Sequence, residues 1–155
     1  MKLDKIDKKI LIELQVDGRA TASNIAEKVG LSVPAAAERI RKLQDSGLIK
    51  GFCVVLDTDI LGLDVSALIT IVSGSSKYYE KVIIEANKTP EVVRCFSTTG
   101  DGSHVLLIQT KNTNSLEILL RKIQSWPGVI RTNTQLILSS YKDLTPIFFD
   151  WNYEK

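Results

Sequence analysis

The chain has 155 residues, of which 44% are hydrophobic and 25% are charged, a composition that is ordinary for a globular protein. This length allows either one large domain or two small ones. No apolar run approaches the roughly 18–20 residues of a membrane span, and the first residues, MKLDKIDKK, lack the apolar region of a signal peptide. We therefore expect a cytoplasmic protein that does not enter a membrane.

The net charge of +2 is distributed unevenly along the chain. Residues 1–50 contain 10 Lys and Arg against 7 Asp and Glu (+3), whereas residues 51–155 contain 10 against 11 (−1). An excess of this size does not establish nucleic-acid binding, but it indicates which half would face DNA. Cys53 and Cys95 form no CxxC pair, so we expect two free, partly buried thiols, with a disulfide or redox switch as the alternative.

Three helices are predicted in the first 50 residues. The apolar spacing predicts helices over residues 4–15 and 22–29, and a third helix that begins at Ser32 and ends at Gly47. A short turn that contains a glycine joins the second helix to the third. This arrangement is a helix-turn-helix pattern.

The third helix has the features of one that reads DNA. Ala37, Ile40 and Leu43 repeat at helical spacing and form its predicted core face. On the opposite side, the side chains are small at the start of the helix and basic further on. Such a surface suits entry into a major groove beside phosphates. The candidate base-reading residues are Ser32, Val33, Pro34, Ala35, Ala36 and Arg39. The candidate phosphate contacts are Arg41, Lys42 and Lys50, with Ser23 and Asn24 at the start of the second helix. The alternative is that Arg39 and Lys42 only solvate an exposed helix face.

The residues after the helices change in character. Residues 51–64, GFCVVLDTDILGLD, predict one or two strands followed by a polar linker. We place the domain boundary there, with a DNA-binding domain over residues 1–50, a hinge strand and linker over residues 51–64, and a second domain over residues 65–155.

The second domain alternates strands and helices. The predicted elements are a strand at 65–73, a helix at 76–88, strands at 91–99 and 104–111, a helix at 114–125 and a strand at 129–140. This order predicts a ferredoxin-like βαββαβ fold, so that the chain as a whole is of the α+β class. Apolar residues on the open sheet face favour a homodimer formed by stacking two such faces. The final residues include Phe148, Phe149, Trp151 and Tyr153, which we expect to pack on their own or a neighbouring subunit.

The motifs occur in an order that resembles the Lrp/AsnC family of bacterial and archaeal transcription regulators. They are LDKIDKKILIELQVDGRAT, IAEKVGLS, ERIRKL and GLIKGF in the first half, and PEV, STTGD, LLI, PGV and a T-x-T strand in the second. The resemblance implies a winged helix-turn-helix that binds double-stranded DNA and a ferredoxin-like domain that dimerises. It also implies an amino-acid effector bound between subunits and assembly into octamers. We expect no cofactor.

The turn between the strands predicted at 91–99 and 104–111 is the candidate effector site. Its glycines let backbone N–H groups approach a carboxylate, and Asp101 can bind an ammonium. The residues alone favour an ordinary hairpin turn, and the resemblance reverses this balance. The family pattern is T-G-D-x-D-[YF], but Ser103 replaces the second acid and His104 the aromatic residue, which weakens the case for a standard amino-acid pocket. The candidate residues are Thr99, Gly100, Asp101, Gly102, Ser103 and His104, with Thr132, Asn133 and Thr134 from a neighbouring subunit.

The expected function is sequence-specific transcription regulation, modulated by an amino acid or a related small molecule. The alternative is an architectural protein that wraps DNA without responding to an effector. The sequence contains no nucleophile–base pair, metal cluster or phosphate loop, so we do not expect an enzyme. The single histidine, His104, lacks the partner ligands that a metal site requires.

Overall fold

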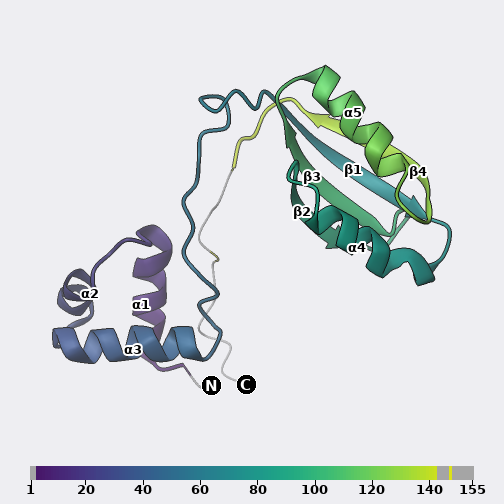
Figure 1. Ribbon diagram of the computed structural model, residues 1–155. Helices are drawn as coiled ribbons and strands as arrows, with labels where there is room; N and C mark the ends of the chain where they lie inside the picture. Colours follow the sequence, from purple (N-terminus) through teal and green to yellow (C-terminus); the bar gives the residue numbers. More distant parts are fainter. Residues whose placement is uncertain (1–2, 143–146, 148–155) are drawn as a thin grey trace. The chain divides into compact units, whose positions relative to one another are not determined.

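A computed structural model describes residues 3–142 and residue 147 of the chain. The chain divides into an N-terminal unit, Met1–Val55 together with Lys142–Lys155, and a C-terminal unit, Leu56–Tyr141 (Figure 1). No helix in the described ranges is long and apolar enough to cross a membrane. The aromatic residues predicted to pack near the C-terminus, Phe148, Phe149, Trp151 and Tyr153, lie outside the described residues.

The described residues of the N-terminal unit form three capped helices: α1 (Lys5–Val16), α2 (Ala22–Val29) and α3 (Val33–Asp45). Asp4 caps α1, because its Oδ1 accepts hydrogen bonds from the N–H groups of Ile6 and Asp7, both at 2.8 Å. Thr21 and Asn24 form a reciprocal capping box at the start of α2. These local contacts explain why the predicted starts of the helices are confirmed within a residue.

One small apolar core joins the three helices. Its fully or nearly fully buried members are Ile10, Leu14, Ile25, Ala26, Ala36 and Leu43. Each helix contributes two of these residues, so the core fixes the side of α3 that remains exposed.

The strand predicted after the helices is absent from the described structure. Residues 51–56 have no regular structure, and a turn follows at residues 58–62. Phe52, Val54, Val55 and Leu56 are exposed. A strand needs a hydrogen-bonding neighbour, and within the described ranges this segment has none. Both cysteines are free, and Cys53 in this segment is exposed instead of partly buried as expected.

The C-terminal unit has the predicted ferredoxin-like order. Its elements are β1 (Val65–Ser73), the 3₁₀ turn η1 (Ser76–Tyr78), α4 (Tyr79–Asn87), β2 (Val92–Ser97), β3 (His104–Thr110), α5 (Thr113–Gln124) and β4 (Val129–Ile137). The sheet has the order β2-β3-β1-β4, and every pair is antiparallel. This arrangement confirms the fold class predicted from the sequence.

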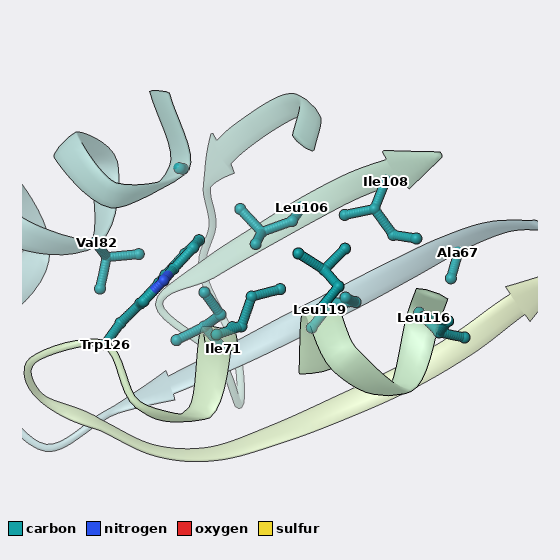
Figure 2. Close-up of a cluster of buried hydrophobic side chains, with 11 residues drawn as sticks. Ala67, Ile71, Val82, Leu106, Ile108, Leu116, Leu119 and Trp126 are labelled. Atoms are coloured by element: carbon teal, nitrogen blue, oxygen red, sulfur yellow. The ribbon is translucent and has the colours of Figure 1, made fainter. Parts of the chain in front are cut away.

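Both helices of this unit pack against the same sheet face. Figure 2 shows the buried cluster that results. Leu119 of α5, Trp126 just after α5 and Val82 of α4 lie in it with Ile71 and Leu106 of the sheet. The alternate residues of β1, among them Leu68 and Thr70, lie on the other face and are half-buried. That open face is where we expect a second copy to stack.

Candidate DNA interface and effector site

The exposed side of α3 is small at its first turn. Ser32, Val33 and Pro34 are exposed, and Ala35 is half-buried. Oγ of Ser32 accepts a hydrogen bond from the N–H of Ala35 at 3.4 Å, and Pro34 occupies the first turn, where a missing N–H is tolerated. The side chains at the start of α3 are therefore short enough for close approach to a major groove.

Ala36 faces the core and not the DNA side of α3. It is completely buried, whereas Ala37 is exposed. Both residues lie about one turn before Ile40, but only Ala36, seven residues before Leu43, shares a helix face with both Ile40 and Leu43. The expected core position of Ala37 is therefore wrong, and Ala36 packs against α1 and α2 in its place. The prediction of Ala36 as a base-reading residue is therefore wrong.

Arg39 joins α3 to the start of α1. Its Nη1 lies 2.7 Å from Oδ2 of Asp4 and 2.7 Å from Oδ1 of Asp7. Hydrogen bonds from Arg39 to Asp4 and then to Asp7 raise the pKa of the guanidinium. The backbone N–H of Asp7 and then Arg39 lower the pKa of Asp4. A base-reading role would require Arg39 to leave both carboxylates, so its position favours bracing of α3.

The remaining basic residues of α3 are paired with acids on the same helix. Nη2 and Nε of Arg41 donate to Glu38 at 2.9 and 3.0 Å, and Nη1 of Arg41 donates to Asp45 at 2.6 Å. Nζ of Lys42 lies 3.7 Å from Glu38. These contacts raise the pKa of Arg41 and lower the pKa of Glu38, chiefly through the hydrogen bond that joins the two. A phosphate would therefore compete with Glu38 for Arg41 and Lys42.

The other predicted phosphate contacts lie at the edges of this surface. Lys50 is exposed and, within the described part of the chain, forms no ion pair. Ser23 is exposed in the first turn of α2, and Oδ1 of Asn24 accepts from the N–H of Thr21 at 3.3 Å. A hollow of about 340 Å³ on the α3 surface is lined by Asp7, Ala35, Glu38, Arg39, Lys42 and Leu43. The N-terminal unit thus presents a shaped surface with mixed charge.

The predicted effector turn folds back onto β1. The N–H of Ser103 donates to the carbonyl of Ile71 at 2.8 Å, and the N–H of Thr98 donates to Ser103 O at 3.0 Å. A Cβ on Gly102 would lie 2.2 Å from Cγ2 of Thr70 and 3.1 Å from the carbonyl oxygen of Ile71. Only glycine allows this approach, and it places the turn against the open sheet face beside Thr70.

Ser103 and His104 point into the unit and away from its surface. Ser103 is 8% exposed, His104 is 1% exposed, and Oγ of Ser103 lies 2.9 Å from Nδ1 of His104. The His104 ring packs edge-on against Tyr79 with 5.1 Å between ring centroids, and burial lowers the pKa of His104. The prediction that these two side chains contact the effector is therefore wrong. They hold the turn in place.

The predicted residues of β4 divide between the two sheet faces. Thr132, Asn133 and Thr134 pair with Ile71, Thr70 and Ile69 respectively. Thr132 accepts from Nε2 of Gln124 at 3.2 Å, so Thr132 and Thr134 belong to the helix side. Asn133 is exposed and shares the open face with Thr70. Only Asn133 of the three is thus brought beside the turn of its own subunit.

Thr70 is the residue at this site that the sequence did not single out. In the sequence, Thr70 is one polar residue in an apolar strand. The glycine that packs against it, Gly102, comes 32 residues later, so the sequence gives no local indication of the contact. In the described ranges, no group of three or more His, Cys, Asp and Glu residues could hold a metal ion. The site is therefore built from backbone N–H groups, one carboxylate and amide or hydroxyl side chains.

Comparisons with known proteins identify both units. A winged helix-turn-helix DNA-binding model matches residues 3–50, and the Lrp/AsnC ligand binding domain model matches residues 64–147. The HTH-type transcriptional regulator FL11 of Pyrococcus horikoshii is 41% identical over 145 residues, which cover 94% of this chain and 95% of that protein.

Two solved structures of similar proteins contain L-methionine. One is the complex of a Neisseria meningitidis transcriptional regulator, with a TM-score of 0.89, 28% identity, and coverage of 94% of this chain and 96% of that chain. The other is the feast or famine regulatory protein of Mycobacterium tuberculosis, with a TM-score of 0.86, 32% identity, and coverage of 92% and 96%. On the two matched models and the relative that spans almost the whole chain, this protein belongs to the Lrp/AsnC family of DNA-binding transcription regulators.

Proposed function

We propose that this regulator reads double-stranded operator DNA through α3 and that an amino acid bound at the turn of residues 99–102 changes its affinity for that DNA. Effector binding at this turn is supported by its unpaired backbone N–H groups. Among the described residues, the N–H groups of residues 99–102 donate no hydrogen bond, and Gly100 has a φ of 101°. A carboxylate could accept from these groups while exposed Asp101 receives the ammonium.

The two complexes of similar proteins with L-methionine support this class of ligand. Both proteins share the fold of this chain over more than nine tenths of its length. On the open sheet face, Asn133 and Thr70 would supply the polar side of the pocket, and exposed Thr99 would add a hydroxyl from the turn. A neighbouring subunit stacked on that face would close the pocket, so we propose that the effector binds to a homodimer. Four such dimers would form the octamer expected from the family.

The DNA half of the proposal depends on exchange of ion pairs. Ser32, Val33, Pro34 and exposed Ala37 would face base edges, where small side chains make apolar contacts such as those to a thymine methyl group. Arg41, Lys42 and Lys50 would turn to phosphates and release Glu38 from its partners. Limited direct readout leaves part of the specificity to DNA shape and bending.

The test measures ligand and DNA binding on the same samples. Thermal-shift screening against the amino acids identifies a ligand, calorimetry measures its affinity, and fluorescence anisotropy measures operator affinity with and without it. Asp101→Asn should abolish the thermal shift, whereas Asp64→Asn, an exposed loop carboxylate outside the turn, should not. Native mass spectrometry of the same samples reports the assembly state.

The turn also favours a second candidate, an architectural protein without an effector. Ser103 and His104 stand where the family pattern has an acid and an aromatic residue, and both are buried. Tight DNA binding together with no thermal shift for any amino acid would establish this second function and refute the first.

A further inference from the structure

Three apolar side chains remain uncovered at the C-terminal end of α1. Ile12 and Val16 lie one helical turn apart and are 44% and 72% exposed. Phe52 is 49% exposed, and its Cδ1 lies 3.4 Å from the position that a Cβ on Gly18 would occupy, just beyond α1. We call Ile12, Val16 and Phe52 the α1 end patch.

The chain returns to this patch near its C-terminus. Of the last residues, Lys142 and Ile147 are described, and both belong to the N-terminal unit. The N–H of Ile147 donates a hydrogen bond of 2.7 Å to Oε1 of Gln15, which lies between Ile12 and Val16 in the sequence of α1. This contact joins residues 132 positions apart and fixes the point from which the last eight residues start.

These eight residues have the composition that the α1 end patch requires. The segment 148–155, FFDWNYEK, contains the aromatic residues Phe148, Phe149, Trp151 and Tyr153. An aromatic side chain buries about 150–250 Å² on packing, so a few suffice to cover three exposed apolar residues. The segment has a net charge of −1 (Asp150 and Glu154 against Lys155), and α1 has a net charge of +1 (three lysines against Asp7 and Glu13), so charge repulsion does not oppose docking.

The segment is long enough, and its attachment makes docking favourable. Eight extended residues span at most about 28 Å, whereas the 12 residues of α1 span about 18 Å. A partner tethered this closely has an effective concentration on the order of millimolar. Weak apolar contacts are then sufficient, which a separate protein would not achieve at ordinary concentrations.

We propose that residues 148–155 form an aromatic strap that docks on the α1 end patch of the same chain. This inference does not depend on the identity of the effector or of the operator.

Tryptophan fluorescence tests the strap directly, because the chain has only two tryptophans. Trp126→Phe leaves Trp151 as the single reporter, and Nε1 of Trp126 has no hydrogen-bond partner to lose within the described structure. We expect Trp151 in the full chain to emit at shorter wavelength, and to be quenched less by acrylamide, than in a synthetic peptide of residues 147–155.

Substitutions in the α1 end patch should reverse this protection. The double variant Ile12→Ser/Val16→Ser should return the emission and quenching of Trp151 to those of the peptide. Ile118→Ser on α5, which is 62% exposed, is the matched control and should change neither. If Trp151 emits like the peptide while Ile12 and Val16 are unsubstituted, the proposal is overturned. Shielding that survives the double variant would place the strap on another surface, such as a second copy, and would also overturn it.

A second measurement removes the dependence on Trp126→Phe. Labelling the otherwise unsubstituted chain with 5-fluorotryptophan gives one fluorine resonance for each tryptophan, and Trp151→Phe assigns them. The resonance of Trp151 should move in Ile12→Ser/Val16→Ser and stay unchanged in Ile118→Ser. A Trp151 resonance that is the same in both variants would contradict docking on α1.

Discussion

Gly102→Ala tests whether the effector turn is held against β1 as the structure shows. The added Cβ would stand 2.2 Å from Cγ2 of Thr70 and 3.1 Å from the carbonyl oxygen of Ile71. Carbon atoms pack best about 3.5–4.0 Å apart, so the turn or Thr70 must move by more than about 1 Å. The carbonyl of Ile71 belongs to a paired strand and cannot move freely.

The cost should be that of overpacking, about 1–3 kcal/mol. For a unit of the size of Leu56–Tyr141, each 1 kcal/mol corresponds to about 4–8 °C in Tm. We therefore expect the C-terminal unit of Gly102→Ala to melt at least about 4 °C lower by calorimetry. Effector affinity should fall as well, because the N–H groups of the turn would be displaced.

Thr70→Ser provides the matched partner, since it removes the Cγ2 atom that the new Cβ would meet. The double variant Gly102→Ala/Thr70→Ser should recover most of the lost Tm, which a double-mutant cycle measures as coupling. An unchanged Tm for Gly102→Ala, or an equal loss with and without Thr70→Ser, would refute the contact between the turn and β1.

The remaining predictions concern charged and titratable groups. Arg39→Ala should lower the Tm of the N-terminal unit and weaken DNA binding without changing the salt dependence of that binding. Lys42→Ala should instead flatten the salt dependence by about one phosphate contact. Fluorescence anisotropy over a salt titration measures both. Glu38→Gln should strengthen DNA binding at low salt and steepen its salt dependence, because it frees Lys42 and leaves Arg41 paired only with Asp45; unchanged affinity would exclude that exchange. Burial lowers the pKa of His104 below 6.5, so the unfolded chain binds a proton that the folded chain does not, and stability should fall as the pH drops below about 6.5. His104→Gln should remove that part of the pH dependence of Tm, and an identical pH profile in the variant would contradict it.

Local signals in the sequence predicted the helices well because their causes are local. Asp4, Thr21 and Ser32 cap the three N-terminal helices through hydrogen bonds to residues two or three positions away. The βαββαβ order follows in the same way from runs of apolar spacing and from turns that contain glycine. The motif order was also sufficient to indicate the family, which the matched models confirm.

The errors in the predicted DNA surface concern residues whose contacts in space decide their role. Ala36 and Ala37 both lie about one turn before Ile40, but only Ala36 also shares a face with Leu43, and the core shows that Ala36 is inside. The partners of Arg39 lie 32 and 35 residues earlier in the chain, so no local pattern indicates them. The strand expected at residues 51–56 has the right composition, but its formation depends on a neighbour that the described chain does not supply.

The sequence by itself determined the elements, their order, the family and the location of the glycine turn. The tertiary structure decided which of those residues are available: it buries Ser103 and His104, engages Arg39 and leaves Asp101 and Asn133 exposed. The physical reason is the range of the interactions. Caps and helical periodicity act within about four residues, whereas the contacts that bury the turn on β1 join positions 32 residues apart.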